Sequence, residues 1–294
     1  MLNNYYLYIT LQDVPVSSTI WGNTQYFTIR RYLINMKKSL VFATILMMAV
    51  SCATTKQTPE GMVNPENKKE WKLVWKDEFN YKDKAQLLKV WESANGPEGH
   101  ILCSRWEENI ELGDGTLLLV NHKENRGGQE WTSGSIWTRR DFMYGYYECR
   151  YKIAAAPRTN SSFWITSRDK SKTPEKGLPF EIDINEGHYP SEYTTCIHDC
   201  SISGPRRKSN PGAKMYPGTD FSKEYHTYGL EWTEDEMVFY IDRKEFRRVR
   251  NEFSKSPAPL FLSEAILKWG DEKVTDAIEG TFMEVDYVRV YSRK

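Results

Sequence analysis

Short segments in which apolar and polar residues alternate recur from Trp71 to the C-terminus, and turns rich in glycine and aspartate separate them. Alternation with a period of two is typical of β-strands that bury one face, whereas the 3.6-residue period of amphipathic helices is scarce here. The pattern predicts roughly a dozen strands and one short helix over residues 85–91. We therefore expect an all-β protein built as a two-sheet sandwich.

One predicted strand, residues 180–188, breaks the alternation and carries three carboxylates. Its apolar residues would face the core, and Glu181, Asp183 and Asn185 would face the opposite side. In an unbroken strand Glu186 would point into the core, where an unpaired carboxylate is costly. One extra residue at Ile184-Asn185, a β-bulge, would return Glu186 to the side of the other two acids.

Two glutamates that flank an aspartate on one solvated face can supply a nucleophile, a general acid and base, and a group that tunes both. Retaining glycosidases need such a pair, with carboxyl groups about 5 to 5.5 Å apart. Four strand steps span roughly 13 Å between Cα atoms, so this chemistry requires a concave sheet. The alternative interpretation is a sheet surface that carries solvated acids.

The aromatic content is compatible with carbohydrate binding, but it does not distinguish a sugar-binding protein from another large β protein. The 294 residues include ten tryptophans and eighteen tyrosines, which can stack on sugar rings but are also common in large β cores. The length suffices for one large β domain. Without residues 1–51 the net charge is about −3, which excludes nucleic-acid binding through bulk charge.

Residues 36–51 resemble the signal peptide of a bacterial lipoprotein. Met36-Lys37-Lys38 precede an apolar run of eleven residues, which is too short to span a bilayer comfortably. The run ends in Ala49-Val50-Ser51-Cys52, which is similar to a lipobox except that its usual leucine is absent, so we expect lipidation at Cys52. The protein would be exported and held at the outer membrane or cell surface only through this anchor.

These signals divide the chain into four parts. Residues 1–35 would be a mis-annotated segment upstream of a start at Met36, and 36–51 the signal peptide. The polar residues 52–70 would form a flexible tether. Residues 71–294 would form the catalytic domain.

Four further cysteines remain in the exported part of the chain: Cys103, Cys149, Cys196 and Cys200. Export permits disulfides, but the sequence does not give their pairing. Cys196-Ile-His198-Asp-Cys200 carries residue types that bind zinc. No second ligand pair accompanies it, and alternate positions along one strand give the same spacing, which favours a plain strand.

The acidic segment Glu181-Ile-Asp183-Ile-Asn-Glu186 resembles the active-site signature of glycoside hydrolase family 16. The match is to the bulged form found in its laminarinase, agarase, porphyranase and carrageenase branches. The resemblance covers residues 71–294 and implies a β-jelly roll like those of the concanavalin A-like lectins and glucanases, with a substrate cleft on its concave sheet. Other segments that agree in family order are Trp75–Phe79, Ser133–Thr138, Tyr144–Glu148, Phe163–Ile165, Tyr225–Trp232 and Val285–Tyr291.

By position in the motif, the resemblance implies a retaining endo-glycosidase that works by double displacement without a catalytic cofactor. Glu181 would be the nucleophile. Glu186 would be the general acid and then the general base. Asp183 would hydrogen-bond Glu181 and bear on how the protons are shared.

The resemblance also implies residues that contact the substrate. Trp164 would stack on a sugar near the scissile bond, and the alternative is a core tryptophan. The other candidates are His188, His198, Trp131, Trp137, Asn95 and Arg139. Each has a structural alternative: a satisfied histidine, a packed tryptophan, a turn asparagine or a solvated arginine.

Two basic clusters, Arg139-Arg140 and Arg206-Arg207-Lys208, favour an anionic substrate because guanidinium groups pair bidentately with oxyanions. Together with the bulge and the aromatic residues, these clusters favour a resemblance to the agarase and porphyranase branch, which implies an algal β-galactan such as agar or porphyran, with β-1,3-glucan as the alternative. Two further alternatives stay open: a non-catalytic carbohydrate-binding protein, because a fold does not imply an activity, and a transglycosylase.

The resemblance finally implies a structural calcium on the convex face, with Glu78 and Asp286 as ligands. Charged residues at strand ends are the alternative, because they need no ion. We expect the protein to act as a monomer on its polysaccharide.

Overall fold

The computed structural model describes residues 61–202 and 209–294. The fold below is that of the unit Thr58–Lys294, as far as its residues are described. The predictions for residues 1–35, the signal peptide, Cys52 and Arg206-Arg207-Lys208 lie outside the described residues. Within those residues, no helix has the length and apolar character needed to cross a membrane.

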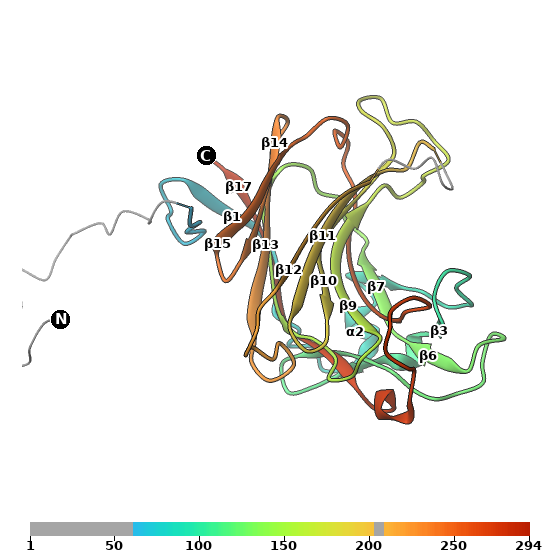
Figure 1. Cartoon of the computed structure of the whole chain (residues 1–294). Coiled ribbons are helices and arrows are strands. Elements are labelled where there is room, and N and C mark those ends of the chain that lie inside the picture. The colour runs from blue at the N-terminus through green and yellow to red at the C-terminus, as the bar shows by residue number, and fades with distance from the viewer. Residues whose placement is uncertain (1–60, 203–208) are drawn as a thin grey trace, which may run out of the picture. The chain divides into compact units, whose positions relative to one another are not determined.

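Two antiparallel sheets face each other across the core, which confirms the predicted all-β sandwich (Figure 1). The eight-stranded sheet has the order β15-β14-β13-β8-β17-β5-β4, and β1 pairs with β17. Its strands are β1 (Trp71–Asp77), β4 (Ile110–Leu112), β5 (Leu117–Val120), β8 (Gly145–Lys152), β13 (His226–Trp232), β14 (Glu236–Ile241), β15 (Lys244–Arg250) and β17 (Phe282–Arg293).

The seven-stranded sheet has the order β12-β11-β10-β9-β16-β7-β2. Its strands are β2 (Trp91–Ser93), β7 (Ser135–Thr138), β9 (Thr159–Thr166), β10 (Phe180–His188), β11 (Glu192–Asp199), β12 (Ser209–Met215) and β16 (Leu260–Ile266). A separate parallel pair, β3 (Cys103–Arg105) and β6 (Trp131–Ser133), lies outside both sheets. The short helices are α2 (Lys84–Leu87), η1 (Glu107–Asn109) and η3 (Asp276–Ile278).

The core forms where the inward faces of the two sheets meet. Tyr147 and Tyr151 of β8 are fully buried in the same apolar cluster as Phe163 of β9 and Ile182 of β10. The alternation along each strand explains this arrangement, because successive side chains point to opposite faces. The polar residues of β9 and β10 are thereby directed to the other face of the seven-stranded sheet.

The bulge predicted in the acidic strand is present. The pairing of β10 shifts register between Asp183 and Asn185 on the β9 side, and between Asp183 and Glu186 on the β11 side. Ile184 and Asn185 are both fully buried, and Glu186 returns to the partly exposed face. The prediction that Asn185 faces the cleft is wrong, because its amide is buried and donates a hydrogen bond to the hydroxyl of Tyr151.

Three details of the prediction need correction. The helix covers only Lys84–Leu87, and Trp91 already belongs to β2. Strand β12 was not indicated by the alternation pattern. The tether is shorter than residues 52–70, because Val63 is buried beside Trp71 and its N–H donates to the carbonyl of Arg243.

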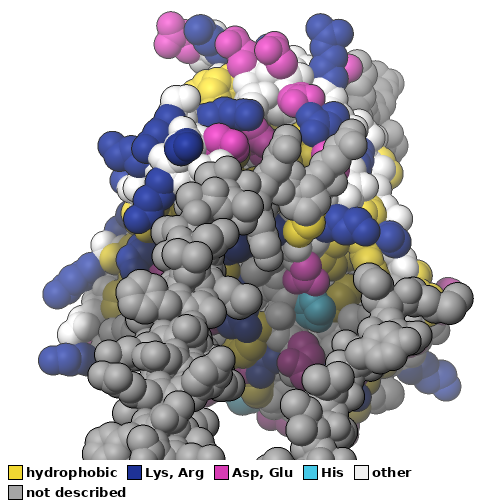
Figure 2. All heavy atoms as spheres, turned by 90° about the vertical axis from the view of Figure 1, so that its left-hand side faces the viewer, with side chains coloured by type: hydrophobic (Ala, Val, Ile, Leu, Met, Phe, Trp, Pro, Cys, Tyr) yellow, Lys and Arg dark blue, Asp and Glu magenta, His cyan; other side chains and the backbone are white. Residues whose placement is uncertain are grey.

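The outer face of the eight-stranded sheet carries compensated charges. Figure 2 shows the side that lies at the left of Figure 1, where basic and acidic side chains are interspersed. Arg248 of β15 pairs with Glu236 of β14, and Lys152 of β8 pairs with Glu284 of β17. Exposed pairs such as Arg248–Glu236 contribute little stability each.

Candidate active site

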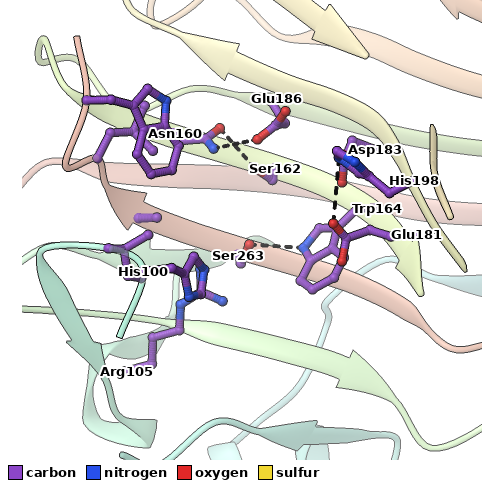
Figure 3. Close-up of a pocket in the computed structure, with 14 residues that line it drawn as sticks. His100, Arg105, Asn160, Ser162, Trp164, Glu181, Asp183, Glu186, His198 and Ser263 are labelled. Carbon is purple, nitrogen blue, oxygen red and sulfur yellow. Dashed lines mark hydrogen bonds and ion pairs between the residues drawn. The ribbon is translucent and has the colours of Figure 1, made fainter. Parts of the chain in front are cut away.

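Strand β10 brings its three acids to one pocket of about 350 Å³ on the outer face of the seven-stranded sheet. The register with β11 places His198 opposite Glu181 and Thr194 opposite Glu186. Figure 3 shows Glu181 and Glu186 at the two ends of this group, with Asp183 near Glu181. The bulge is what allows both glutamates to line the same pocket.

Each glutamate has a different polar partner. The amide of Asn160 donates to Oε1 of Glu186 at 2.9 Å, and Asn160 itself accepts a hydrogen bond from Ser162 at 2.9 Å. Glu181 accepts from the ammonium group of Lys170. A positive charge beside one carboxylate and a neutral amide beside the other give the two acids distinct environments, as a nucleophile and an acid/base require.

His198 connects the acids to strand β12. Its Nε2 lies 3.2 Å from Oδ2 of Asp183 and 3.8 Å from Oε1 of Glu181. Its Nδ1 lies 2.6 Å from the hydroxyl of Ser209. His198 therefore lines the pocket and orients the carboxylates from the β11 side.

Trp164 of β9 also lines the pocket, directly beside Asp183 in the strand register. It is partly exposed, and its ring stacks on Phe261 with centroids 4.3 Å apart. Its indole N–H donates to the hydroxyl of Ser263 at 3.0 Å. Packing on one side and a hydrogen bond at the edge hold the ring as a rigid wall of the pocket.

The other two tryptophans do not line this pocket. Trp137 of β7 stacks on Phe261, with centroids 5.5 Å apart, on the side away from the acids. Trp131 is 3 % exposed and packs with Ile101 and Cys103. Trp131 is thus a packed core side chain, whereas Trp137 is partly exposed beside Phe261, and its contact with substrate stays a prediction.

Three polar candidates also lie outside the pocket. Asn95 accepts from the backbone N–H of Glu107 at 3.0 Å, as a turn residue does. The guanidinium of Arg139 donates to the carbonyl of Leu88 at 2.9 Å. His188 lies at the end of β10, with Nε2 3.5 Å from Thr194.

The pocket contains several residues that the sequence reasoning missed. Asn160 and Ser162 share a face of β9 with Trp164, so the period of two could have revealed them. Ser263 likewise follows Phe261 by two residues on β16. His100, Arg105 and Trp269 come from segments outside the seven-stranded sheet, and no pattern in the sequence marks them. The structure assigns all six to the pocket lining.

The cysteines form no disulfide among the described residues. Cys196 does come close to the acids: ligand-type atoms of Asp183, Cys196 and His198 lie within 4.8 Å of one another. Burial, and then the charges of Asp183 and Glu186, raise the pKa of the Cys196 thiol to about 12. Both nitrogens of His198 already have polar neighbours, Nε2 at Asp183 and Nδ1 at Ser209.

The structure does not support a calcium site at Glu78 and Asp286. Both oxygens of Glu78 accept from the guanidinium of Arg289 at 3.0 Å, and Asp286 pairs with Arg150. Calcium needs several uncompensated oxygen ligands. The two arginines already supply the positive charge that the ion would provide.

Comparisons with known proteins agree with this geometry. The model of the family described as glycosyl hydrolases family 16 matches residues 97–287. The kappa-carrageenase of Pseudoalteromonas carrageenovora is 28 % identical over 290 residues, covering 84 % of this chain and 70 % of that protein. A beta-glucanase of Acetivibrio thermocellus is 28 % identical over 177 residues, which is 59 % of this chain and only 49 % of that protein.

A solved structure extends the similarity to three dimensions. SCLam, a non-specific endo-beta-1,3(4)-glucanase from family GH16, superposes with a TM-score of 0.67 at 29 % identity. The match covers 80 % of this chain and 95 % of that one. The family model spans well over half of the chain, including the acidic strand and its neighbours. The chain therefore belongs to glycosyl hydrolase family 16.

Proposed function

We propose that the chain is a retaining, endo-acting β-glycosidase that hydrolyses a polysaccharide by double displacement. The observation that carries this proposal is the bulge in β10, which brings Glu181 and Glu186 to one pocket with Asp183 between them. A protein that only bound carbohydrate would have no need of this arrangement. The endo-acting mode agrees with the glucanases and carrageenase that resemble the chain.

In the first step, Glu181 attacks the anomeric carbon and displaces the leaving sugar, while Glu186 gives its proton to the glycosidic oxygen. In the second step, Glu186 takes a proton from water, and that water releases the sugar from Glu181. Asn160 holds Glu186 through one hydrogen bond. His198 lies within 4 Å of both Asp183 and Glu181 and maintains their arrangement through both steps.

For the substrate, we propose an algal β-galactan such as agar or porphyran. The similarity to a kappa-carrageenase over 84 % of this chain supports a galactan. A laminarinase-type endo-β-1,3-glucanase is the second candidate, because SCLam is described as an endo-beta-1,3(4)-glucanase. The attachment of the protein to a membrane through Cys52 remains a prediction from the sequence.

The test is digestion of agarose, porphyran, carrageenans, laminarin and lichenan, with the products sized by chromatography. We expect a ladder of oligosaccharides from at least one galactan. Glu181→Gln and Glu186→Gln should each lower turnover by at least about 10³-fold, since each removes a group that acts in the transition state.

Unchanged circular dichroism of both variants would show that the loss is chemical. Substantial activity in either variant would overturn the assignment of roles. Release of single sugars only would contradict an endo mode, and a ladder from laminarin alone would favour the second candidate.

A further inference from the structure

A second groove, of about 590 Å³, lies on the outer face of the eight-stranded sheet, where the segment before β1 meets the end of β17. Trp71 and Tyr291 line it and pack with Tyr146, which alternates along β8 with the core residue Tyr147. Figure 1 shows β1 and the segment before it on the side of the eight-stranded sheet away from β10 and β11. The groove and the catalytic acids therefore belong to opposite faces of the sandwich.

Lysines and exposed apolar side chains surround this groove. Lys68, Lys72 and Lys294 line it together with Leu73. Leu73 is 44 % exposed, and the next residue of β1, Val74, is 38 % exposed. A surface that combines ammonium groups with exposed apolar side chains is typical of proteins that contact the headgroup region of a bilayer.

The turn that carries two of these lysines is held in place by hydrogen bonds. The side chain of Asn67 accepts from the backbone N–H of Lys69 at 3.2 Å, and its carbonyl accepts from the N–H of Glu70 at 3.0 Å. The ammonium group of Lys294 donates to the carbonyl of Lys68. The lysines thus lie on a preformed surface, so binding requires little ordering of the backbone.

The positive charge of this surface is not compensated within it. Lys68, Lys69 and Lys72 are exposed and form no ion pair with a residue that the structure describes. Of the two acids in the same segment, Glu66 already contacts a guanidinium at 3.3 Å, and Glu70 accepts from a neighbouring amide at 2.9 Å. The surface therefore keeps a net positive charge, which attracts anionic headgroups.

The lipid anchor predicted from the sequence would bring this surface to a membrane. Cys52 precedes the first described residue, Gly61, by nine positions. Nine residues span at most about 30 Å when fully extended, and a short connection raises the effective concentration of the second contact. A bilayer that held the anchor would be within reach of the segment that carries the lysines.

We propose that residues 66–76 and Lys294 form a docking surface for the anionic headgroups of a phospholipid bilayer. The ammonium groups pair with lipid phosphates, and Leu73 and Val74 enter the headgroup region. Because the catalytic acids lie on the opposite face, docking leaves their pocket open to the polysaccharide. This contact adds to the predicted anchor and depends on neither the anchor nor the proposed hydrolysis.

Hydrogen–deuterium exchange of the full chain, followed by mass spectrometry, tests this surface directly. The probes are vesicles of phosphatidylcholine alone and vesicles that also contain phosphatidylglycerol. We expect the anionic vesicles to slow exchange in residues 66–76 by at least about fivefold relative to the neutral ones, with no change in β10 and β11. Insertion of the predicted anchor or signal peptide into either kind of vesicle would not by itself slow exchange at these residues.

A variant that removes charge from the docking surface adds a quantitative test. Combining Lys68→Gln, Lys69→Gln and Lys72→Gln should weaken binding to anionic vesicles by about tenfold or more in cosedimentation, because each lysine near a charged bilayer contributes up to about fivefold. The matched control should stay within about twofold of the wild type. It replaces three exposed lysines outside the docking surface, Lys89→Gln, Lys176→Gln and Lys223→Gln.

Unchanged circular dichroism would show that both variants fold. Equal slowing by neutral and anionic vesicles, or no slowing in residues 66–76, would overturn the proposal. Equal loss of vesicle binding in the two variants would overturn it as well, because net charge alone would then explain the binding. Slower exchange at these residues when only the protein concentration is raised would assign the surface to a second copy of the chain and contradict the lipid contact.

Discussion

Glu264 is a fully buried carboxyl group directly behind the active-site pocket. It lies on β16 between Ser263 and Ala265, which both line the pocket, and it accepts a hydrogen bond from Ser161 at 2.5 Å. Burial raises its pKa from 4.5 to about 7, and the hydrogen bond from Ser161 only partly opposes this effect. The folded protein therefore holds a proton on Glu264 at pH values where the unfolded chain has released it.

This proton makes the stability of the domain depend on pH. Between about pH 4.5 and pH 7 the folded state binds more protons than the unfolded state, so the free energy of unfolding falls as the pH rises through this range. The shift corresponds to about 3 kcal/mol, at about 1.4 kcal/mol for each pKa unit. In urea unfolding, Glu264→Gln should gain stability relative to the wild type as the pH increases from 4.5 to 8. A difference that does not vary with pH would contradict the buried, protonated state.

The sequence predicted the positions of residues whose placement follows from the local alternation of apolar and polar side chains. Glu181, Asp183 and Glu186 are separated by a spacing that fits a strand only with a bulge, so their shared face followed from alternation alone. Arg105 and His100 reach the same pocket from segments about 80 residues earlier in the chain. Their contribution depends on how distant segments pack, which a period of two cannot show.

Among the elements, strand β10 depends on a glycine directly after Glu186. A Cβ atom placed on Gly187 would lie 2.6 Å from Cγ2 of Ile153. Contacts this short do not occur without movement of the backbone or of a packed side chain. Gly187 therefore lets β10 approach the core closely at the point where Glu186 turns out.

Gly187→Ala should destabilise the domain by about 1 to 3 kcal/mol through overpacking. It should also lower kcat more than it raises KM, because displaced backbone moves Glu186 away from the glycosidic oxygen. Chemical denaturation and steady-state kinetics measure the two effects. Gly99→Ala is the matched control for stability, since a Cβ there meets no atom within 4 Å. Wild-type stability of Gly187→Ala would show that the close approach does not constrain β10.

Strand β12 escaped prediction because its own sequence is unfavourable for a strand. β12 contains Pro211 and Gly212, which are both unfavourable in strands, and its residues are mostly exposed. It forms at the sheet edge because β11 offers unpaired backbone groups in register from Glu192 to His198. Pairing with a neighbour thus overrides local propensity, and only the folded structure reveals it.

At the scale of the whole domain, the packing of the two sheets determines which face carries the pocket. The eight-stranded sheet supplies a buried face against which the seven-stranded sheet packs, and the outer face of the latter carries the pocket. This division was predictable, because alternation over many strands assigns one face to the core. The basic residue that lines the pocket was less predictable: Arg139 lies outside the pocket, and Arg105 lines it.

If Glu181 and Glu186 act as a retaining pair, the first product keeps the anomeric configuration of the substrate. Proton NMR of the wild-type protein would follow hydrolysis of a polysaccharide that it cleaves, before mutarotation mixes the anomers. Two displacements at the same carbon should yield the β-anomer first, with the α-anomer appearing later at the rate of mutarotation. Initial formation of the α-anomer would contradict the mechanism.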